Sequence, residues 1–105
     1  MRNTLVLAAV TIILALGAQS ARAQSGADTY KSKCMMCHGA DGSGNTPAGK
    51  AMQAIPLNLP ALIKASDADL IAATLNGKGK MPAYSGKLTP AQVKEVIAYV
   101  RTLQK

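Results

Sequence analysis

The chain has 105 residues and a formal net charge of +7 at pH 7. A chain of this length is expected to form one domain, and a domain this small buries only about 60% of the surface that its unfolded chain exposes. The sequence contains no phenylalanine or tryptophan and three tyrosines. A large apolar core built from its own side chains is therefore excluded, and we expect a bound apolar group to complete the interior.

The first predicted segment is a secretory signal peptide over residues 1–23. Arg2 supplies a positive N-terminal region, residues 5–16 are apolar, and residues 21–23 match an A-x-A cleavage site. Cleavage there leaves a mature domain of residues 24–105 that begins at Gln24, in the periplasm. The alternative is an uncleaved membrane anchor, but the apolar run is shorter than the about 20 residues that a spanning helix needs. We therefore expect no membrane span in the mature chain.

The first predicted helix covers residues 26–37, because Ser25 and Asp28 have the spacing of a capping box. It ends in the motif Cys-Met-Met-Cys-His, whose C-x-x-C-H spacing is typical of c-type haem attachment. Two thiols three positions apart on one helical turn can both form thioethers to the same haem, and the next residue then lies beneath the iron. The motif therefore predicts Cys34 and Cys37 as attachment residues and His38 as the proximal iron ligand.

The two cysteines have three other interpretations: a small disulfide, a thioredoxin-like redox pair and half of a zinc site. Zinc would need carboxylates to complete four ligands, because the chain has two cysteines and one histidine. A thioredoxin-like pair belongs in a βαβ unit, and no segment here alternates like a strand. That interpretation also leaves His38 unexplained, so the motif favours haem attachment.

The segment from residue 39 to residue 60 is rich in glycine and proline, which predicts a loop with short helical turns near Pro47 and Pro60. A second helix is predicted from Ser66, as its N-terminal cap with Asp69 three positions on, to the residue before Gly77.

The third predicted helix opens with Thr89 as its cap, Pro90 in its first turn and Gln92 at its third position. Apolar residues follow at helical spacing: Val93, Val96, Ile97, Val100 and Leu103. The pattern predicts an all-α domain with three main helices.

The chain resembles the small monohaem class I cytochromes c of bacteria, which are periplasmic electron carriers. Gly26 and Tyr30 before the motif, Val96 and Tyr99 in the last helix, and the glycine-rich residues 37–44 carry the resemblance. It implies a small all-α cytochrome c fold, in which three main helices and loops surround one covalently attached haem c. It also implies that the glycine lets the first and last helices cross closely, with an aromatic side chain packed into the crossing.

Met81 is the candidate for the sixth iron ligand, because the family has a distal methionine followed by proline, as in Met81-Pro82. The glycines of this loop allow a close backbone approach, and Pro82 restricts Met81 to an extended conformation. With no second histidine, a bis-histidine haem cannot form within one chain. Met35 and Met36 lie inside the attachment turn and cannot reach the opposite face of the haem. Met52 remains a competitor, although its simpler role is to fill a gap in a loop or in the core.

The ring nitrogen of His38 that does not bind iron needs a hydrogen-bond acceptor. The resemblance implies the backbone carbonyl of a proline shortly after the motif. Pro47 is the nearest match, and Pro56 and Pro60 remain alternatives.

The resemblance implies a monomeric protein, not an enzyme, that passes single electrons between larger redox proteins. A basic rim around an exposed haem edge would steer it toward acidic docking surfaces. The lysines near the motif and the Met81 loop are Lys31, Lys33, Lys78, Lys80 and Lys87. Two alternatives are an electron-transfer subunit of a dehydrogenase or oxidase complex, and a haem sensor or enzyme with an open sixth position. Nucleic-acid binding is not expected, because no surface combines basic and aromatic residues.

Overall fold

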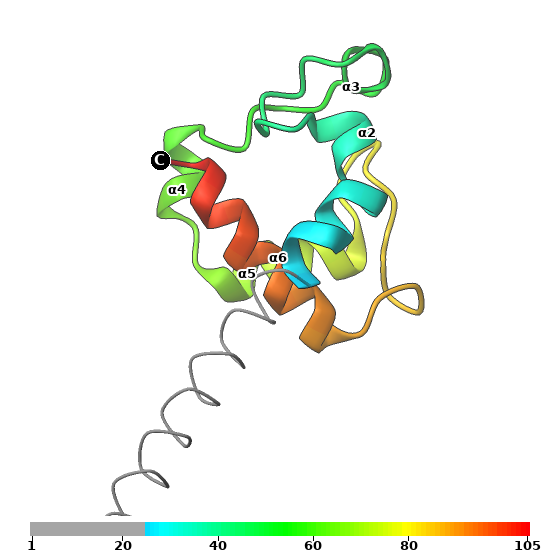
Figure 1. Cartoon of the computed structure of the whole chain (residues 1–105), viewed down its shortest axis with the longest axis vertical. Coiled ribbons are helices and arrows are strands. Elements are labelled where there is room, and N and C mark those ends of the chain that lie inside the picture. The colour runs from blue at the N-terminus through cyan, green and yellow to red at the C-terminus, as the bar shows by residue number, and fades with distance from the viewer. Residues whose placement is uncertain (1–24) are drawn as a thin grey trace, which may run out of the picture.

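The computed structural model describes residues 25–105, in which the regular structure is helical and no strand is formed. Helical residues 25–33 are followed by the named helices α2 (Met35–His38), α3 (Pro47–Ala51), α4 (Pro60–Lys64), α5 (Asp67–Asn76) and α6 (Pro90–Leu103) (Figure 1). This confirms the predicted all-α fold. Within residues 25–105, no helix has both the length and the apolar character that a membrane crossing requires. The predicted signal peptide lies outside the described residues.

The helix ends follow from the capping residues in the sequence. The Ser66 hydroxyl accepts a hydrogen bond from the backbone N–H of Asp69 at 3.0 Å, at the start of α5. At the start of α6, Thr89 and Gln92 form both hydrogen bonds of a capping box. The predicted short turns are α3 and α4, and each has a proline in its first turn.

The first predicted helix is not continuous. Residue Cys34 is a turn with φ −115° between helical residues 25–33 and α2, and α2 runs one residue further than predicted, to His38. The N–H of Cys34 donates to the carbonyl of Tyr30 at 2.8 Å, and the N–H of His38 donates to the carbonyl of Cys34 at 2.9 Å, so hydrogen bonding continues through the turn. The last four residues of the motif therefore form their own short helix, with Cys34 as its N-cap.

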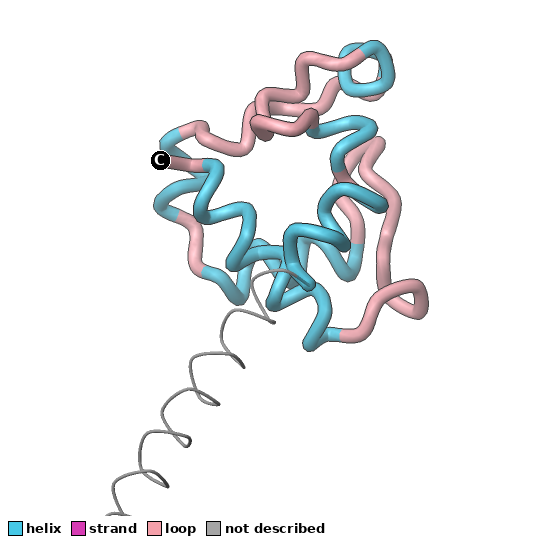
Figure 2. The backbone as a smooth tube through the Cα atoms, in the orientation of Figure 1, coloured by secondary structure: helices cyan, strands magenta, loops and turns pink. Residues whose placement is uncertain are grey.

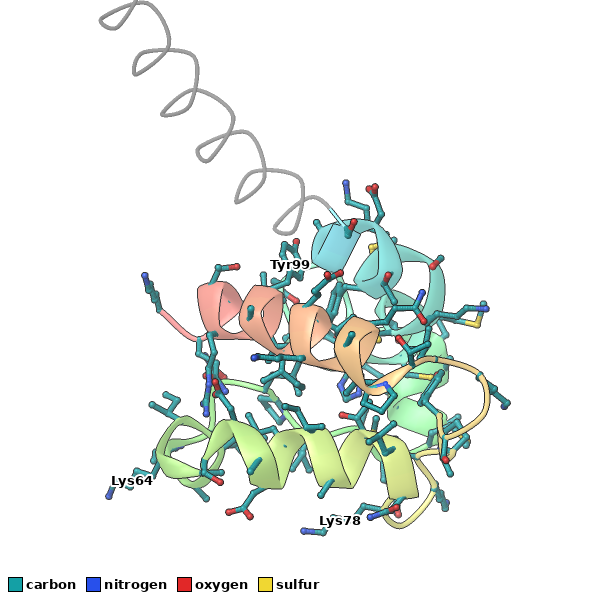
Figure 3. All side chains as sticks on the ribbon, turned by 90° about the horizontal axis from the view of Figure 1, so that it is seen from below. Lys64, Lys78 and Tyr99 are labelled. Carbon is teal, nitrogen blue, oxygen red and sulfur yellow. The ribbon has the colours of Figure 1, made fainter. Side chains whose placement is uncertain are left out.

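Close packing of the first helical residues against α6 confirms the predicted crossing. A Cβ atom at Gly26 would overlap the backbone oxygen of Glu95, so a side chain there would force the helices apart. Tyr30, only 1% exposed, packs with its ring centroid 5.2 Å from that of Tyr99. Figure 3 shows Tyr99 between α6 and the N-terminal helical residues. Val96 and Val100 complete this buried cluster.

A second buried cluster joins α5 to α6. Its buried members are Leu88, Val93 and Ile97, and the partly buried residues packed against them are Leu70, Ile71, Leu75 and Tyr84. Together the two clusters give α6 one apolar face toward the N-terminal helix and another toward α5, as its helical spacing predicted.

Side chains at the end of α6 attach the segment between residues 57 and 67 to this helix. Arg101 donates hydrogen bonds to the backbone oxygens of Leu62 and Ala65 and is paired with Asp67 at 2.9 Å. Gln104 donates to the backbone oxygen of Leu57 at 2.8 Å. Figure 2 shows the result, in which helices and loops follow one another around a ring. These side chains thus hold the segment between residues 57 and 67 in place.

We expect Gly26→Ala to lower the free energy of unfolding by about 1 to 3 kcal/mol, the usual cost of overpacking. Alanine ordinarily stabilises a helix relative to glycine by about 1 kcal/mol. A loss of stability in Gly26→Ala would therefore come from the close crossing and not from helix propensity. Denaturant unfolding measures it. Ser32→Ala, at an exposed position of the same helical stretch, is the control and should be nearly neutral. A Gly26→Ala protein as stable as the parent would contradict this packing.

Candidate haem-binding site

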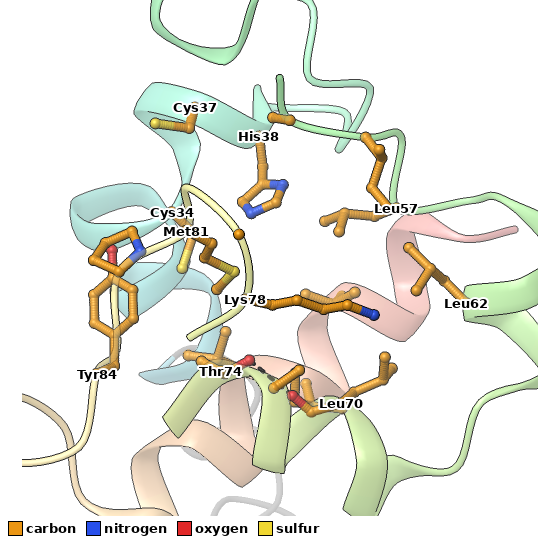
Figure 4. Close-up of a pocket in the computed structure, with 18 of the residues that line it drawn as sticks. Cys34, Cys37, His38, Leu57, Leu62, Leu70, Thr74, Lys78, Met81 and Tyr84 are labelled. Atoms are coloured by element: carbon orange, nitrogen blue, oxygen red, sulfur yellow. Dashed lines mark hydrogen bonds between the residues drawn. The ribbon is translucent and has the colours of Figure 1, made fainter. Parts of the chain in front are cut away.

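A cavity of about 590 Å³ lies inside the ring of helices and loops. This volume is within the range of about 300 to 1,000 Å³ that is usual for ligand and cofactor sites. Its walls are mainly apolar and come from α2, the loop after α3, α5, the loop before α6, and α6 itself. The predicted site residues Cys34, Cys37, His38 and Met81 all line it (Figure 4).

Two side-chain hydroxyls bind backbone oxygens in and after α2 and so set the orientation of the motif. The buried hydroxyl of Tyr30 donates to the carbonyl oxygen of Gly39, directly after the motif, at 2.6 Å. The hydroxyl of Thr46 donates to the carbonyl oxygen of Met36 at 2.7 Å and accepts from the N–H of Gly49 at 2.8 Å. The same residue therefore binds α2 and caps α3. Figure 4 shows the His38 ring directed into the cavity from the α2 side.

His38 is suited to bind a metal. Its Nδ1 atom is buried and has no hydrogen-bond partner among the described residues. A buried polar atom without a partner costs free energy, so Nδ1 needs a hydrogen-bond acceptor, and the other ring nitrogen, Nε2, is the one left to bind a ligand in the cavity. Burial also lowers the pKa of the imidazole, so the ring is neutral at pH 7 and can ligate a metal ion.

The two cysteines are free thiols, which excludes a disulfide in this structure. Burial, with a smaller contribution from Cys37, raises the pKa of Cys34 to about 11. Reactive redox pairs instead have a thiolate stabilised near neutral pH, so the thioredoxin-like interpretation is not supported. No group of three His, Cys, Asp or Glu side chains that could hold a metal ion occurs within residues 25–105.

The structure brings two of the methionines to the cavity. Met81 is partly buried and Met52 is 43% exposed, and both line the wall. Met35 packs instead against the cluster around Tyr30, and Met36 is 78% exposed. The cavity therefore holds both the candidate Met81 and its competitor Met52, and the assignment of the distal ligand to Met81 stays a prediction.

The loop that carries Met81 is sharply turned at its start. Gly77 has φ +78°, and a Cβ there would approach the carbonyl oxygen of Met81 and the amide nitrogen of Ala83, each at 2.9 Å. Only glycine meets both demands without strain. The hydrogen bonds between Lys78 and Met81, at 3.0 and 3.2 Å, then close the loop on itself.

Pro47 lies at the start of α3, is exposed and does not line the cavity. The expected hydrogen bond from His38 to its carbonyl oxygen does not occur among the described residues. Its role as the acceptor stays a prediction, as do those of Pro56 and Pro60.

The sequence analysis missed several polar residues of the cavity wall, among them Tyr84 and Thr74. Tyr84 lines the cavity, and burial raises the pKa of its hydroxyl above the ordinary value. Thr74 is buried in α5 and donates to the carbonyl oxygen of Leu70 at 2.8 Å. The sequence offered one signal for Tyr84, which is that it lies three residues after the candidate ligand Met81 in the same loop.

An apolar cavity with two thiols and a neutral imidazole on one wall fits an iron porphyrin. The thiols can bind the porphyrin through thioether bonds, and the imidazole can bind the iron. The fold and the site together define a c-type cytochrome.

Comparison with known proteins gives the family. The family model described as cytochrome c oxidase, cbb3-type, subunit III, matches residues 21–100. Cytochrome c6 of Nostoc sp. is 33% identical over 90% of this chain and 82% of its own length, and cytochrome c6 of Limnospira maxima is 34% identical over 72% and 86%. The chain therefore belongs to the small monohaem class I cytochromes c, and its cofactor is covalently bound haem c.

The cbb3-type cytochrome c oxidase subunit CcoP of Azospirillum brasilense is also similar. It is 34% identical over 87% of this chain, but the matched part is 32% of the subunit's own length. The chain thus spans about a third of that relative.

Proposed function

We propose that this protein is a single-electron carrier whose iron is bound by His38 and Met81. Bound haem supplies a one-electron iron(III)/iron(II) couple to this site. The observation that carries the proposal is that His38, Met81 and both cysteines line one cavity. The likeness to proteins named cytochrome c6 supports a carrier.

Ligation from both sides explains why the protein would carry electrons rather than act on a substrate. With the imidazole of His38 and the thioether of Met81 both bound, no position on the metal remains for a substrate. Ligation by histidine and methionine also raises the reduction potential. We therefore assign no catalytic residue, and we retain Pro47 as the candidate acceptor for the His38 N–H.

The edge of the cavity is basic. Lys33, Lys78 and Lys80 line it from two different segments, and all three are exposed to solvent. The one acidic residue among the described lining residues is Asp69. A positive rim of this kind attracts an acidic surface and raises the rate of encounter. We infer that the partners are larger redox proteins with acidic docking surfaces, which a monomeric carrier visits in turn.

A second candidate function is a dedicated electron-transfer subunit of an oxidase complex in a respiratory chain. The match to the cbb3-type subunit III family and to part of CcoP favours it. Purification under mild conditions distinguishes the two functions. A free carrier elutes at the mass of its own chain with haem, whereas a subunit co-elutes in fixed proportion with larger proteins.

We propose that residues 1–23 are a signal peptide and that the protein works in the periplasm. The expected N-terminal residue of the purified protein is Gln24, because residues 21–23 offer small side chains at both recognition positions. Mass measurement of the intact protein tests this. A chain that retains Met1 and sediments with membranes would support the anchor instead.

The distal ligand is tested by Met81→Ala, with Met52→Ala as the matched control because Met52 also lines the cavity. A sulfur-to-iron bond gives oxidised haem a weak absorption band near the red end of the visible spectrum. We expect Met81→Ala to abolish this band, to admit carbon monoxide and to lower the reduction potential. Met52→Ala should leave all three unchanged.

The reverse result in the two variants would assign the distal position to Met52. A parent protein that is high-spin and binds carbon monoxide readily at neutral pH would contradict ligation from both sides. That outcome would favour a haem sensor or enzyme with an open sixth position.

The basic rim is tested by Lys78→Gln combined with Lys80→Gln. The probe is a gold electrode coated with a carboxylate-terminated monolayer, which presents an acidic surface. We expect electron transfer at low salt to slow by about tenfold and to depend less on ionic strength, because fewer positive charges face the surface.

The control for charge alone is Lys64→Gln combined with Lys94→Gln. Both lysines are exposed and neither lines the cavity, and Figure 3 shows Lys64 at the opposite end of α5 from Lys78. Equal slowing in the two double variants would mean that net charge, and not the rim, steers encounter.

A further inference from the structure

Two tyrosine hydroxyls hold the haem-attachment motif from its two ends. Tyr30 donates to the carbonyl oxygen of Gly39, just after the motif, at 2.6 Å. Tyr84 donates to the carbonyl oxygen of Lys33, just before Cys34, at 2.9 Å. The first bond is local to the N-terminal part of the chain. The second joins residues 51 positions apart and comes from the loop that carries Met81.

The Met81 loop is firmly attached to α5 at its far end. The N–H of Tyr84 donates to the carbonyl oxygen of Thr74 at 3.1 Å, and the N–H of Ser85 donates to that of Leu75 at 3.0 Å. These bonds determine where the backbone of Tyr84 lies. Its ring is partly buried in the cavity wall, with the Lys87 ammonium 5.8 Å from the ring centroid.

One hydrogen bond joins the Met81 loop to the attachment segment, by which we mean residues 33–38. Among the hydrogen bonds of residues 25–105, the one from Tyr84 to Lys33 is the only one that joins residues 77–85 to residues 25–38. The tip of the loop is exposed, and a Cβ built at Gly79 would meet no atom within 4 Å. This bond is therefore the direct hydrogen-bonded link between the Met81 loop and the attachment segment.

We propose that Tyr84 is a positioning residue, whose hydrogen bond to the backbone of Lys33 holds the Met81 loop against the attachment segment and so keeps the Met81 sulfur on the iron. This inference rests on the proposed His38 and Met81 ligation. Covalent bonds at Cys34 and Cys37 would fix the haem to that segment. Any movement of the loop away from Lys33 therefore moves the sulfur away from the metal.

Tyr84→Phe tests the role, because it removes one hydroxyl and keeps the ring that fills the wall. Loss of a hydrogen bond of ordinary net strength should raise the equilibrium constant for release of the sulfur about 3- to 10-fold. We expect the red band of the oxidised protein to disappear at a lower temperature than in the parent. Carbon monoxide binding by the reduced protein should increase by a similar factor.

The matched control is Tyr99→Phe. Tyr99 packs on Tyr30, and its hydroxyl makes no hydrogen bond within the described residues. Tyr99→Phe should leave the absorption band and carbon monoxide binding unchanged. Far-UV circular dichroism on the same samples reports unfolding of the whole domain. If Tyr84 is a positioning residue, Tyr84→Phe lowers the midpoint temperature for loss of the band much more than the midpoint temperature for unfolding.

Three results would overturn the inference. An unchanged band midpoint and unchanged carbon monoxide binding in Tyr84→Phe would remove it and leave the ligation proposal intact. Loss of the band in step with unfolding of the domain would give Tyr84 a structural role only. A parent protein without the band would remove the Met81 proposal itself, and the role of Tyr84 with it.

Discussion

The structure depends on a cavity that the chain's own side chains do not fill. The buried apolar residues form two small clusters, one where the N-terminal helix crosses α6 and one between α5 and α6. Between them lies a space of about 590 Å³ with mainly apolar walls. Met52 and Ile55 line it and are 43% and 51% exposed. A haem, which we propose is joined through Cys34 and Cys37, would supply the large flat apolar surface that such walls require.

Hydrogen bonds to backbone oxygens, rather than a larger core, hold the ring around that cavity. Tyr30, Thr46 and Tyr84 bind backbone oxygens in or next to α2, while Arg101 and Gln104 attach the segment between residues 57 and 67 to the end of α6. Different hydrogen bonds therefore hold the two sides of the cavity.

The local features of the fold could be predicted because they follow from neighbouring residues. Ser66 and Thr89 cap helices within three positions of themselves, and the spacing of the motif places its side chains on one turn. The crossing at Gly26 was accessible through the family resemblance. The turn at Cys34 was not predicted, because it interrupts a segment whose sequence is compatible with a continuous helix.

Long-range contacts were inaccessible for a different reason. Tyr84 and Lys33 meet across 51 positions, and Arg101 reaches Ala65 across 36, so no local pattern encodes either bond. The sequence also could not separate Met52 from Met81 by geometry, and the structure places both at the cavity. What distinguishes Met81 is the loop around it, with the turn at Gly77 and the restriction imposed by Pro82.

The central claim is that a covalently bound haem completes this domain, and denaturing mass spectrometry tests it most directly. The protein should be made in cells that are competent to mature c-type cytochromes and extracted with acidified acetone before measurement. The account predicts the mass of the chain plus one haem, retained because Cys34 and Cys37 hold it through thioether bonds. A mass equal to the polypeptide alone would contradict it.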